Sequence, residues 1–259
     1  MIFNNKVILI TGASSGIGLE LARQLASLNC KLVLAARREP TLKEIEKELR
    51  QINKDIVSVK CDVTNQEEIK NTIQTAINTF KKIDIAILNA GINIKSTNNE
   101  LDSKALGKIL DVNIIGMSYF FEELLPVFKS RGGMFVGVSS LADGRGFPLS
   151  GFYCASKAAV TLFLESQRIE LKPFNIKVLT VKPGFVKTPM TDKNKFKMPF
   201  LMNVEKAAKI ILKGIEKEKS IIQFPWQTVL GAKILRFLPN PLFDLIAEKH
   251  RKTHLQKSR

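Results

Sequence analysis

A tyrosine and a lysine four residues apart form a pair whose spacing suits proton transfer. Tyr153 and Lys157 belong to a run of helical period over 153–172, and residues four apart lie one above the other on one helical face. An ammonium beside a phenol stabilises the phenolate and lowers a pKa that is ordinarily about 10. The phenol can then exchange a proton with an alcohol or carbonyl oxygen. Because Tyr-x-x-x-Lys is also common on helix surfaces, the interpretation depends on the neighbouring residues.

Two polar residues support the catalytic interpretation. Ser140 follows an apolar run that ends at Val138, and the carboxyl ends of parallel strands face the ligand crevice. A hydroxyl there can hydrogen-bond the reacting oxygen and orient it. Asn113, expected at the start of another helical segment, can bind water or backbone and connect the lysine to solvent. The predicted catalytic residues are therefore Asn113, Ser140, Tyr153 and Lys157.

Three glycines predict a phosphate-binding turn. They lie in the segment TGASSGIG, after the first apolar run and before a helical run. Glycines let a turn adopt unusual dihedral angles and let the backbone approach a pyrophosphate closely, and the N-terminus of the next helix attracts phosphate. Glycine-rich turns also serve as plain loops, but the strand before and the helix after favour a dinucleotide site. The predicted cofactor contacts in this turn are Gly12, Ser14, Ser15, Gly16, Ile17 and Gly18.

The end of the second apolar run bears on which nicotinamide dinucleotide is used. A site that prefers NAD usually places Asp or Glu there to accept from the ribose 2′-OH. Here the run ends in Ala35 and Ala36, and Arg37 and Arg38 follow. Two guanidinium groups can donate charge-assisted hydrogen bonds to a 2′-phosphate, although two arginines are unremarkable in a basic protein. The absent acid favours NADP(H), with Arg37 and Arg38 among its ligands.

Short β-branched runs alternate with longer helical runs. Parallel neighbouring strands need crossover connections, and near-continuous apolar strands are buried on both faces. The pattern therefore predicts an α/β fold, a Rossmann-type doubly wound parallel sheet in three layers and a single domain. The expected strands are 7–10, 32–36, 56–59, 83–88, 134–138, 176–181 and 220–224, and the expected helices are 19–28, 42–51, 66–80, 101–129, 153–172 and 204–216.

The domain is expected to have three parts. Residues 1–190 would form the cofactor-binding and catalytic core. Residues 191–224 would supply a substrate-covering segment, a helix and the last strand. Residues 225–259 would form a basic amphipathic C-terminal extension.

The composition narrows the class of protein. Apolar residues make up 45% of the 259 residues, as in ordinary globular proteins. A formal charge of +16 favours anionic partners or reflects a solvated, lysine-rich surface. Three separated cysteines indicate neither a disulfide framework nor a zinc site, and no metal site is predicted. No signal peptide or membrane-spanning run is evident, so a cytoplasmic location is expected.

In order along the chain, the motifs resemble the short-chain dehydrogenase/reductase family in its short form. The resemblance covers residues 5–190 and rests on TGASSGIG at 11–18, Asp62-Val63, Asn89-Ala90-Gly91, Asn113, Ser140, YCASK at 153–157, Pro183-Gly184 and Thr188. It implies that Tyr153 is the general acid/base and that Lys157 lowers its pKa and holds the nicotinamide ribose. It also implies that Ser140 polarises the substrate oxygen and that Asn113 supports a proton-relay water.

The same resemblance implies the remaining cofactor contacts. Asp62 would bind the adenine edge, and Val63 would contact the adenine ring. The segment Asn89, Ala90 and Gly91 would line the ribose. The nicotinamide amide would be held by Pro183, Gly184, Val186 and Thr188. Family members usually pair through their long helices, so a homodimer or homotetramer is also implied.

The expected substrate side is apolar and suits a small lipophilic carbonyl or alcohol. After Thr188, a group of apolar residues either forms a lid or belongs to the core: Phe196, Met198, Phe200, Leu201 and Met202. A second apolar group flanks the motifs: Ile92, Ile94, Leu141, Phe147 and Phe185.

The C-terminal extension combines apolar and basic residues. The apolar members are Val229, Leu230, Ile234, Leu235, Phe237, Leu238, Leu242, Phe243, Leu245 and Ile246, and the basic members are Lys233, Arg236, Lys249, Arg251 and Lys252. Such a pattern fits a helix lying on an anionic membrane. Packing over the substrate cleft or across a dimer interface is the plainer alternative and is favoured over the membrane.

Three functions compete. An NADP(H)-dependent reductase or dehydrogenase acting on a lipophilic ketone or aldehyde is favoured, because all four catalytic positions are filled. A catalytically idle protein that senses NADP(H) or scaffolds partners is the alternative. Nucleic-acid binding is disfavoured, since two tyrosines and one tryptophan offer little capacity for stacking on bases.

Overall fold

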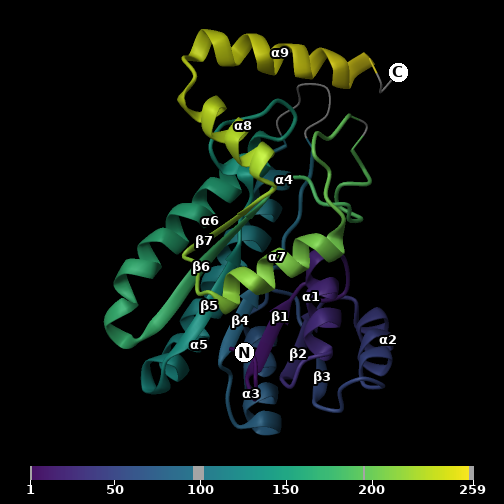
Figure 1. Cartoon of the computed structure of the whole chain (residues 1–259), viewed down its shortest axis with the longest axis vertical. Coiled ribbons are helices and arrows are strands. Elements are labelled where there is room, and N and C mark those ends of the chain that lie inside the picture. Colours follow the sequence, from purple (N-terminus) through teal and green to yellow (C-terminus); the bar gives the residue numbers. More distant parts are fainter. Residues whose placement is uncertain (1, 96–101, 195, 257–259) are drawn as a thin grey trace.

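A seven-stranded parallel sheet forms the centre of the protein (Figure 1). The computed structural model describes residues 2–95, 102–194 and 196–256, without the side chains of 250 and 252–256. The strands are β1 (Val7–Thr11), β2 (Lys31–Ala36), β3 (Ile56–Lys60), β4 (Ile85–Leu88), β5 (Gly133–Val138), β6 (Ile176–Pro183) and β7 (Ile221–Phe224). Their order, β3-β2-β1-β4-β5-β6-β7, changes direction between β1 and β4. Such a switch point opens a crevice at the carboxyl ends of the two strands.

Helices cover both faces of the sheet. They are α1 (Gly16–Ala26), α2 (Glu39–Leu49), α3 (Gln66–Phe80), α4 (Ser103–Leu110), α5 (Gly116–Arg131), α6 (Gly151–Glu170), α7 (Val204–Glu216), α8 (Trp226–Phe237) and α9 (Asn240–Gln256). Alternate residues of a strand point to opposite faces. Ile8 and Ile10 therefore pack with α1, α2 and α7, while Val7 and Leu9 pack with α3, α5 and α6. The predicted three-layer, single-domain α/β fold is confirmed.

Local signals explain why some predicted boundaries match the observed ones. Helix α3 spans the predicted residues because Asn65 caps its N-terminus, accepting from the backbone N–H groups of Glu67 and Glu68, and because Lys81 ends it in the left-handed conformation. Both features are local in sequence.

The helix predicted over 101–129 is wrong as one regular element. A π-helical turn, Asp111–Ile115, separates α4 from α5, and residue 101 lies outside the described residues. Asn113 therefore lies in the middle of a helical stretch and not at the start of one. Its side chain makes tertiary hydrogen bonds described below, and π-turns often accompany such functional contacts.

The C-terminal extension forms α8 and α9, which lie beyond the carboxyl ends of the strands (Figure 1). Arg145 fastens the junction between them: it donates to the carbonyl oxygen of Leu238 at 3.1 Å and to Oδ1 of Asn240 at 3.2 Å. Its guanidinium also lies 3.9 Å from the centroid of the Phe243 ring. None of the described helices is long and apolar enough to cross a bilayer.

Candidate active site

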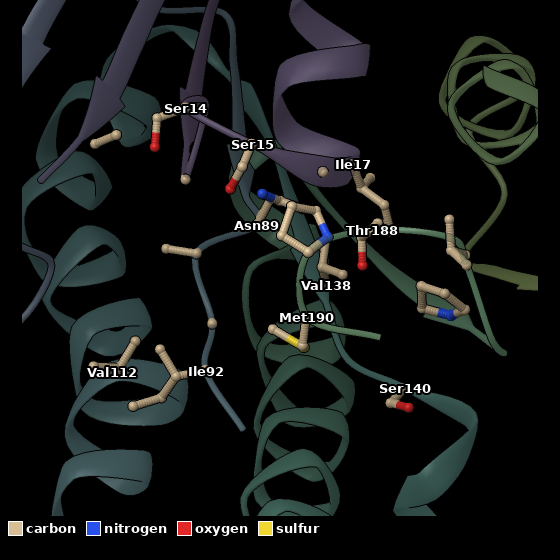
Figure 2. A pocket seen from close by; sticks show the side chains of 18 of the residues that line it. Ser14, Ser15, Ile17, Asn89, Ile92, Val112, Val138, Ser140, Thr188 and Met190 are labelled. Carbon is tan, nitrogen blue, oxygen red and sulfur yellow. The ribbon is translucent and has the colours of Figure 1, made fainter. Parts of the chain in front are cut away.

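A cleft of about 480 Å³ opens at the switch point between β1 and β4. Every residue predicted for catalysis or cofactor binding lines it except Gly18 and Asn113. Figure 2 shows Ser14, Ser15 and Ile17 at the glycine turn, with Thr188 close by and Ser140 farther along the cleft. The fold therefore brings together residues that are separated by more than half of the chain.

The glycine turn is closely packed against the end of β4. Gly12 and Gly16 have φ values of +67° and +56°, a region that disfavours residues with a Cβ. A Cβ at Gly18 would lie 2.5 Å from the Gly12 carbonyl oxygen, which explains why Gly18 shapes the turn without lining the cleft. Asn89 stabilises the start of the turn, because its Nδ2 donates to the Thr11 carbonyl at 3.0 Å.

The N-terminus of α1 is available to an anion. Its N-cap, Ser15, makes no side-chain hydrogen bond to the first turn, so the first backbone N–H groups of the helix have no side-chain acceptor there. Free N–H groups and the positive end of the helix dipole attract phosphate. Because Ser15, Gly16 and Ile17 line the cleft, this helix end suits a pyrophosphate.

Two arginines stand where β2 enters the cleft. Nη2 of Arg38 donates to the Ser14 carbonyl oxygen at 3.2 Å and to its Oγ at 3.1 Å. Nη1 of Arg37 lies 3.8 Å from a carboxylate oxygen of Asp62, so the expected adenine contact also has a basic neighbour. The arginines therefore place positive charge beside the glycine turn.

Tyr153 and Ser140 meet in the cleft. Burial raises the pKa of Tyr153 to about 12, and a hydrogen bond with the Ser140 side chain offsets part of this rise. Oγ of Ser140 also accepts from the backbone N–H of Ala142 at 3.1 Å, which fixes the serine at the start of a short 3₁₀ turn, Leu141–Asp143. Two hydroxyl groups are thus held together at one point.

Lys157 lies beside this pair but is held by the backbone. Its Nζ donates to the Val138 carbonyl oxygen at 2.9 Å and lies 5.8 Å from the centroid of the Tyr153 ring. Burial lowers the pKa of Lys157 to about 8. The expected lowering of the pKa of Tyr153 by Lys157 is therefore wrong for this arrangement, because burial of the phenol dominates.

Asn113 is fully buried and clamps the chain that follows β4. Its Oδ1 accepts from the backbone N–H of Ile92 at 2.8 Å, and its Nδ2 donates to the Ile92 carbonyl at 3.0 Å. The same Nδ2 donates to Oγ of Ser156 at 2.9 Å. A Cβ on Gly91 would lie 3.2 Å from Oδ1 of Asn113 and 3.4 Å from Nζ of Lys157. Asn113 therefore makes the expected contact with the backbone.

A buried ion pair supports the turn that carries Ser140. Asp143, at the end of this turn, lies 2.6 Å from Nζ of Lys182, and the two side chains are only 6% and 12% exposed. Asp143 also accepts from Oγ1 of Thr161 at 2.5 Å, and Thr161 shares a hydrogen bond with Ser139. The pair therefore connects the turn after β5 with α6 and the end of β6.

Replacing Asp143 with asparagine should destabilise the protein by about 3–5 kcal/mol, because it leaves the buried ammonium of Lys182 unpaired. Urea unfolding would measure the change. The double variant Asp143→Asn/Lys182→Met should recover most of the loss, since it removes both buried charges. A double variant no more stable than Asp143→Asn alone would show that the pair does not account for the effect.

Several residues that line the cleft were not among the site residues predicted from the sequence. They are Ala36, Val112, Val138, Ser139, Pro189, Met190 and Thr191. Thr191 has a clear structural role, since its Oγ1 donates to the Val186 carbonyl at 2.6 Å and accepts from the N–H of Thr188 at 2.9 Å. The one signal in the sequence that could have identified Thr191 was its place three residues after Thr188.

The residues of the expected apolar lid differ in their burial and contacts. Met202 is buried and pairs with Val186 in an isolated bridge, so it belongs to the core. Phe200 and Leu201 are exposed. Phe196 packs edge-on against Phe185. Of the residues named for the substrate side, Ile92 is the one that lines the cleft. Residues 196–201 lie in turns and irregular backbone, so tertiary contacts decide which of these side chains are buried, and composition alone does not reveal it.

The polar side chains elsewhere offer little alternative chemistry. All three cysteines are free and buried. Among the described residues, no group of three or more His, Cys, Asp or Glu side chains could hold a metal ion. The chemistry of the chain is therefore best sought in the cleft.

Comparison with known proteins agrees with this fold and cleft. Residues 6–198 match the family model described as short chain dehydrogenase. An uncharacterized oxidoreductase of Myxococcus xanthus is 34% identical over 95% of this chain and 98% of its own. The 11-beta-hydroxysteroid dehydrogenase-like 3 protein of Arabidopsis thaliana is 35% identical over 85% of this chain and 73% of its own.

Solved structures show the same fold. A short chain dehydrogenase/reductase from Burkholderia phymatum, crystallised in complex with NAD, has a TM-score of 0.83 and 23% identity, and the match covers 90% of this chain and 93% of that one. Fold and cleft together define an oxidoreductase of the Rossmann-like, nucleotide-binding class. The chain belongs to the short-chain dehydrogenase/reductase family.

Proposed function

We propose that this protein is an NADP(H)-dependent oxidoreductase that transfers hydride between the nicotinamide and a carbonyl or secondary alcohol. The observation that carries this proposal is the meeting of the Tyr153 and Ser140 hydroxyls in a cleft that also contains the glycine turn. The cleft suits a dinucleotide because Gly12, Gly16 and the uncapped N-terminus of α1 line it, and free backbone N–H groups at a helix N-terminus attract phosphate.

The chain's own residues supply the proton and the orientation, while a bound nicotinamide would supply or accept the hydride. Ser140 donates a hydrogen bond to the substrate oxygen and holds it near the phenol. Tyr153 donates its proton to that oxygen during reduction. Its raised pKa keeps the phenol protonated at neutral pH, which is the form a general acid needs.

Lys157 and Asn113 act on this centre from the side. The ammonium of Lys157 is charged below a pH of about 8, and with its Nζ fixed on the Val138 carbonyl it would hold the nicotinamide ribose. Asn113 fixes the backbone of Ile92, which forms one wall of the cleft. Lys157 and Asn113 would therefore help to position the substrate and the cofactor relative to Tyr153 and Ser140.

Preference for NADP(H) is supported by the charge beside the glycine turn. The side chain of Arg38 reaches Ser14, and Arg37 lies at the same rim. Strand β2 ends at Ala36, so the carboxylate that would accept from an NAD ribose is missing there. Two guanidinium groups suit the 2′-phosphate of NADP(H).

A lipophilic ketone or aldehyde is the proposed substrate. Ile92, Val112 and Met190 line the cleft and give it an apolar part; all three are labelled in Figure 2. The Arabidopsis relative is named for a hydroxysteroid dehydrogenase, which is a lipophilic class of alcohol. Helix α6 exposes Leu162 and Ile169, which supports pairing with a second copy as a homodimer or homotetramer.

A panel of aldehydes and ketones, assayed with NADPH and with NADH at the nicotinamide absorbance, tests the proposed function. We expect NADPH oxidation to be fastest with apolar carbonyls. If the protein bound NADPH but neither reduced any carbonyl nor oxidised any alcohol with NADP⁺, the idle sensor or scaffold would be favoured instead.

A further inference from the structure

Helix α8 presents an apolar face that nothing in the described part of the chain covers. Trp226, Leu230, Ile234 and Phe237 are all exposed, with Trp226 at 71% and Phe237 at 83%. Their spacing of four, four and three residues places them on one side of the helix. No residue of α8 is buried, so the helix rests on the protein with its apolar face directed outwards.

Helix α9, which follows α8 along the chain, also exposes apolar residues. Its Phe243 and Ala247 are buried, whereas Leu242, Leu245 and Ile246 are exposed. Phe243 packs against Phe147. The helix is therefore anchored by one side while a second apolar side remains outward. We call the exposed apolar residues of the two helices the C-terminal apolar face: Trp226, Leu230, Ile234, Phe237, Leu242, Leu245 and Ile246.

The C-terminal apolar face lies beside the mouth of the cleft. A Cβ on Gly184, which lines the cleft, would lie 3.1 Å from Cγ2 of Thr228 on α8. Arg236 of α8 approaches Gly144, just after the turn that carries Ser140. The exposed side chains of Phe200 and Leu201 belong to the segment that follows Met190 of the cleft wall. Both α8 and α9 lie at this end of the molecule (Figure 1).

Positive charge accompanies these apolar residues. Lys233 and Arg236 are exposed on α8 itself, and Lys193 and Lys197 are exposed on the segment beside the cleft. Apolar side chains bordered by cations are the pattern that inserts shallowly into a membrane of anionic lipid. The net charge of +16 adds long-range attraction to such a surface.

A second copy of the chain suits this face less well. In a two-fold dimer the same patch meets itself, which would set Lys233 and Arg236 near their own counterparts and bring like charges together. Leu162 and Ile169 on α6 offer a separate apolar strip for self-association. Charge complementarity therefore favours an anionic lipid surface.

We propose that the C-terminal apolar face docks on an anionic lipid bilayer, so that the cleft opens towards the membrane in which a lipophilic substrate dissolves. Docking itself does not depend on the proposed reaction, because the helices that form the face contribute no residue to the lining of the cleft.

The only tryptophan of the chain reports on docking directly. Trp226 should shift its emission to shorter wavelength when the full-length protein meets phosphatidylcholine vesicles containing phosphatidylserine, and brominated lipid should quench it. Vesicles of phosphatidylcholine alone should cause a much smaller shift. Moderate salt should weaken but not abolish binding, since the apolar contacts persist.

Two variants distinguish binding through the C-terminal apolar face from nonspecific adsorption of exposed apolar residues to vesicles. Leu230→Ser/Ile234→Ser/Phe237→Ser should reduce cosedimentation with the anionic vesicles by on the order of tenfold or more. Ile52→Ser, which removes an equally exposed side chain from the turn between α2 and β3, should bind like the unchanged protein. Both should turn over a water-soluble carbonyl normally, so a failure of docking is distinct from a failure of the proposed function.

Two results would overturn the proposal. One is an unchanged Trp226 emission in the presence of anionic vesicles. The other is a shift in oligomeric mass for the triple variant, measured by light scattering, without any loss of vesicle binding, since a second copy would then be the partner of this face.

Discussion

Replacing Tyr153 with phenylalanine is expected to lower kcat/KM for carbonyl reduction by about 10²–10⁴-fold, the range that positioned proton transfer contributes. The change removes one oxygen atom and keeps the ring, so packing around α6 should persist. Ser140 would still orient the substrate, but no group in contact with its oxygen would donate the proton. Steady-state rates of NADPH oxidation with the best carbonyl of the panel measure the effect.

Tyr119→Phe provides a matched control for this experiment. Tyr119 is the other tyrosine of the chain and packs at the core on the α5 side, away from the cleft. Its variant should keep near-normal turnover. NADPH binding, followed by the fluorescence of the reduced nicotinamide, should survive in Tyr153→Phe. A Tyr153→Phe enzyme with more than about a tenth of normal activity would contradict the role of the phenol as proton donor.

Removing both arginines at the end of β2 should abolish the preference for NADPH. A hydrogen bond to a charged group contributes about 1.5–3 kcal/mol, and exposure weakens it. Arg37 has a side chain that is 61% exposed, so the lower end of the range applies. Arg37→Ala/Arg38→Ala is therefore expected to lower kcat/KM for NADPH by about 10²-fold, while kcat/KM for NADH changes little.

Arg50→Ala is the control for the loss of positive charge. Arg50 follows α2 and pairs with Glu46 at 3.4 Å, and it does not line the cleft. Its variant should keep the coenzyme ratio of the unchanged protein. An equal loss with NADPH and NADH in the double variant would mean that the arginines shape the glycine turn through Ser14 and do not recognise the 2′-phosphate.

Much of the fold followed from patterns that are local in sequence. Apolar runs such as Val7–Ile10 are buried on both faces of the sheet, and this requires near-continuous hydrophobicity whatever the neighbours are. The limits of α3 depend on Asn65 and Lys81, which lie at its two ends. In the candidate site, the glycine turn was predictable because unusual φ angles at Gly12 and Gly16 require glycine itself.

Contacts between distant segments were not predictable in the same way. The π-turn at Asn113 depends on hydrogen bonds to Ile92 and Ser156, and no local signal separates it from a regular helix. The ion pair of Asp143 and Lys182 joins residues on two different elements. The pKa of Tyr153 was expected to be low from its spacing to Lys157, but burial and the Val138 carbonyl decide the balance.

The sequence alone determined the order of strands and helices along the chain, the glycine turn and the candidate residues for catalysis, because each depends on periodicity, on motif spacing or on the conformational limits of single residues. The tertiary structure decided which side chains meet, how deeply Tyr153 and Lys157 are buried, and that the apolar residues of α8 face outwards. Burial and electrostatics depend on every element that packs around a group, and that surrounding exists only once the chain has folded.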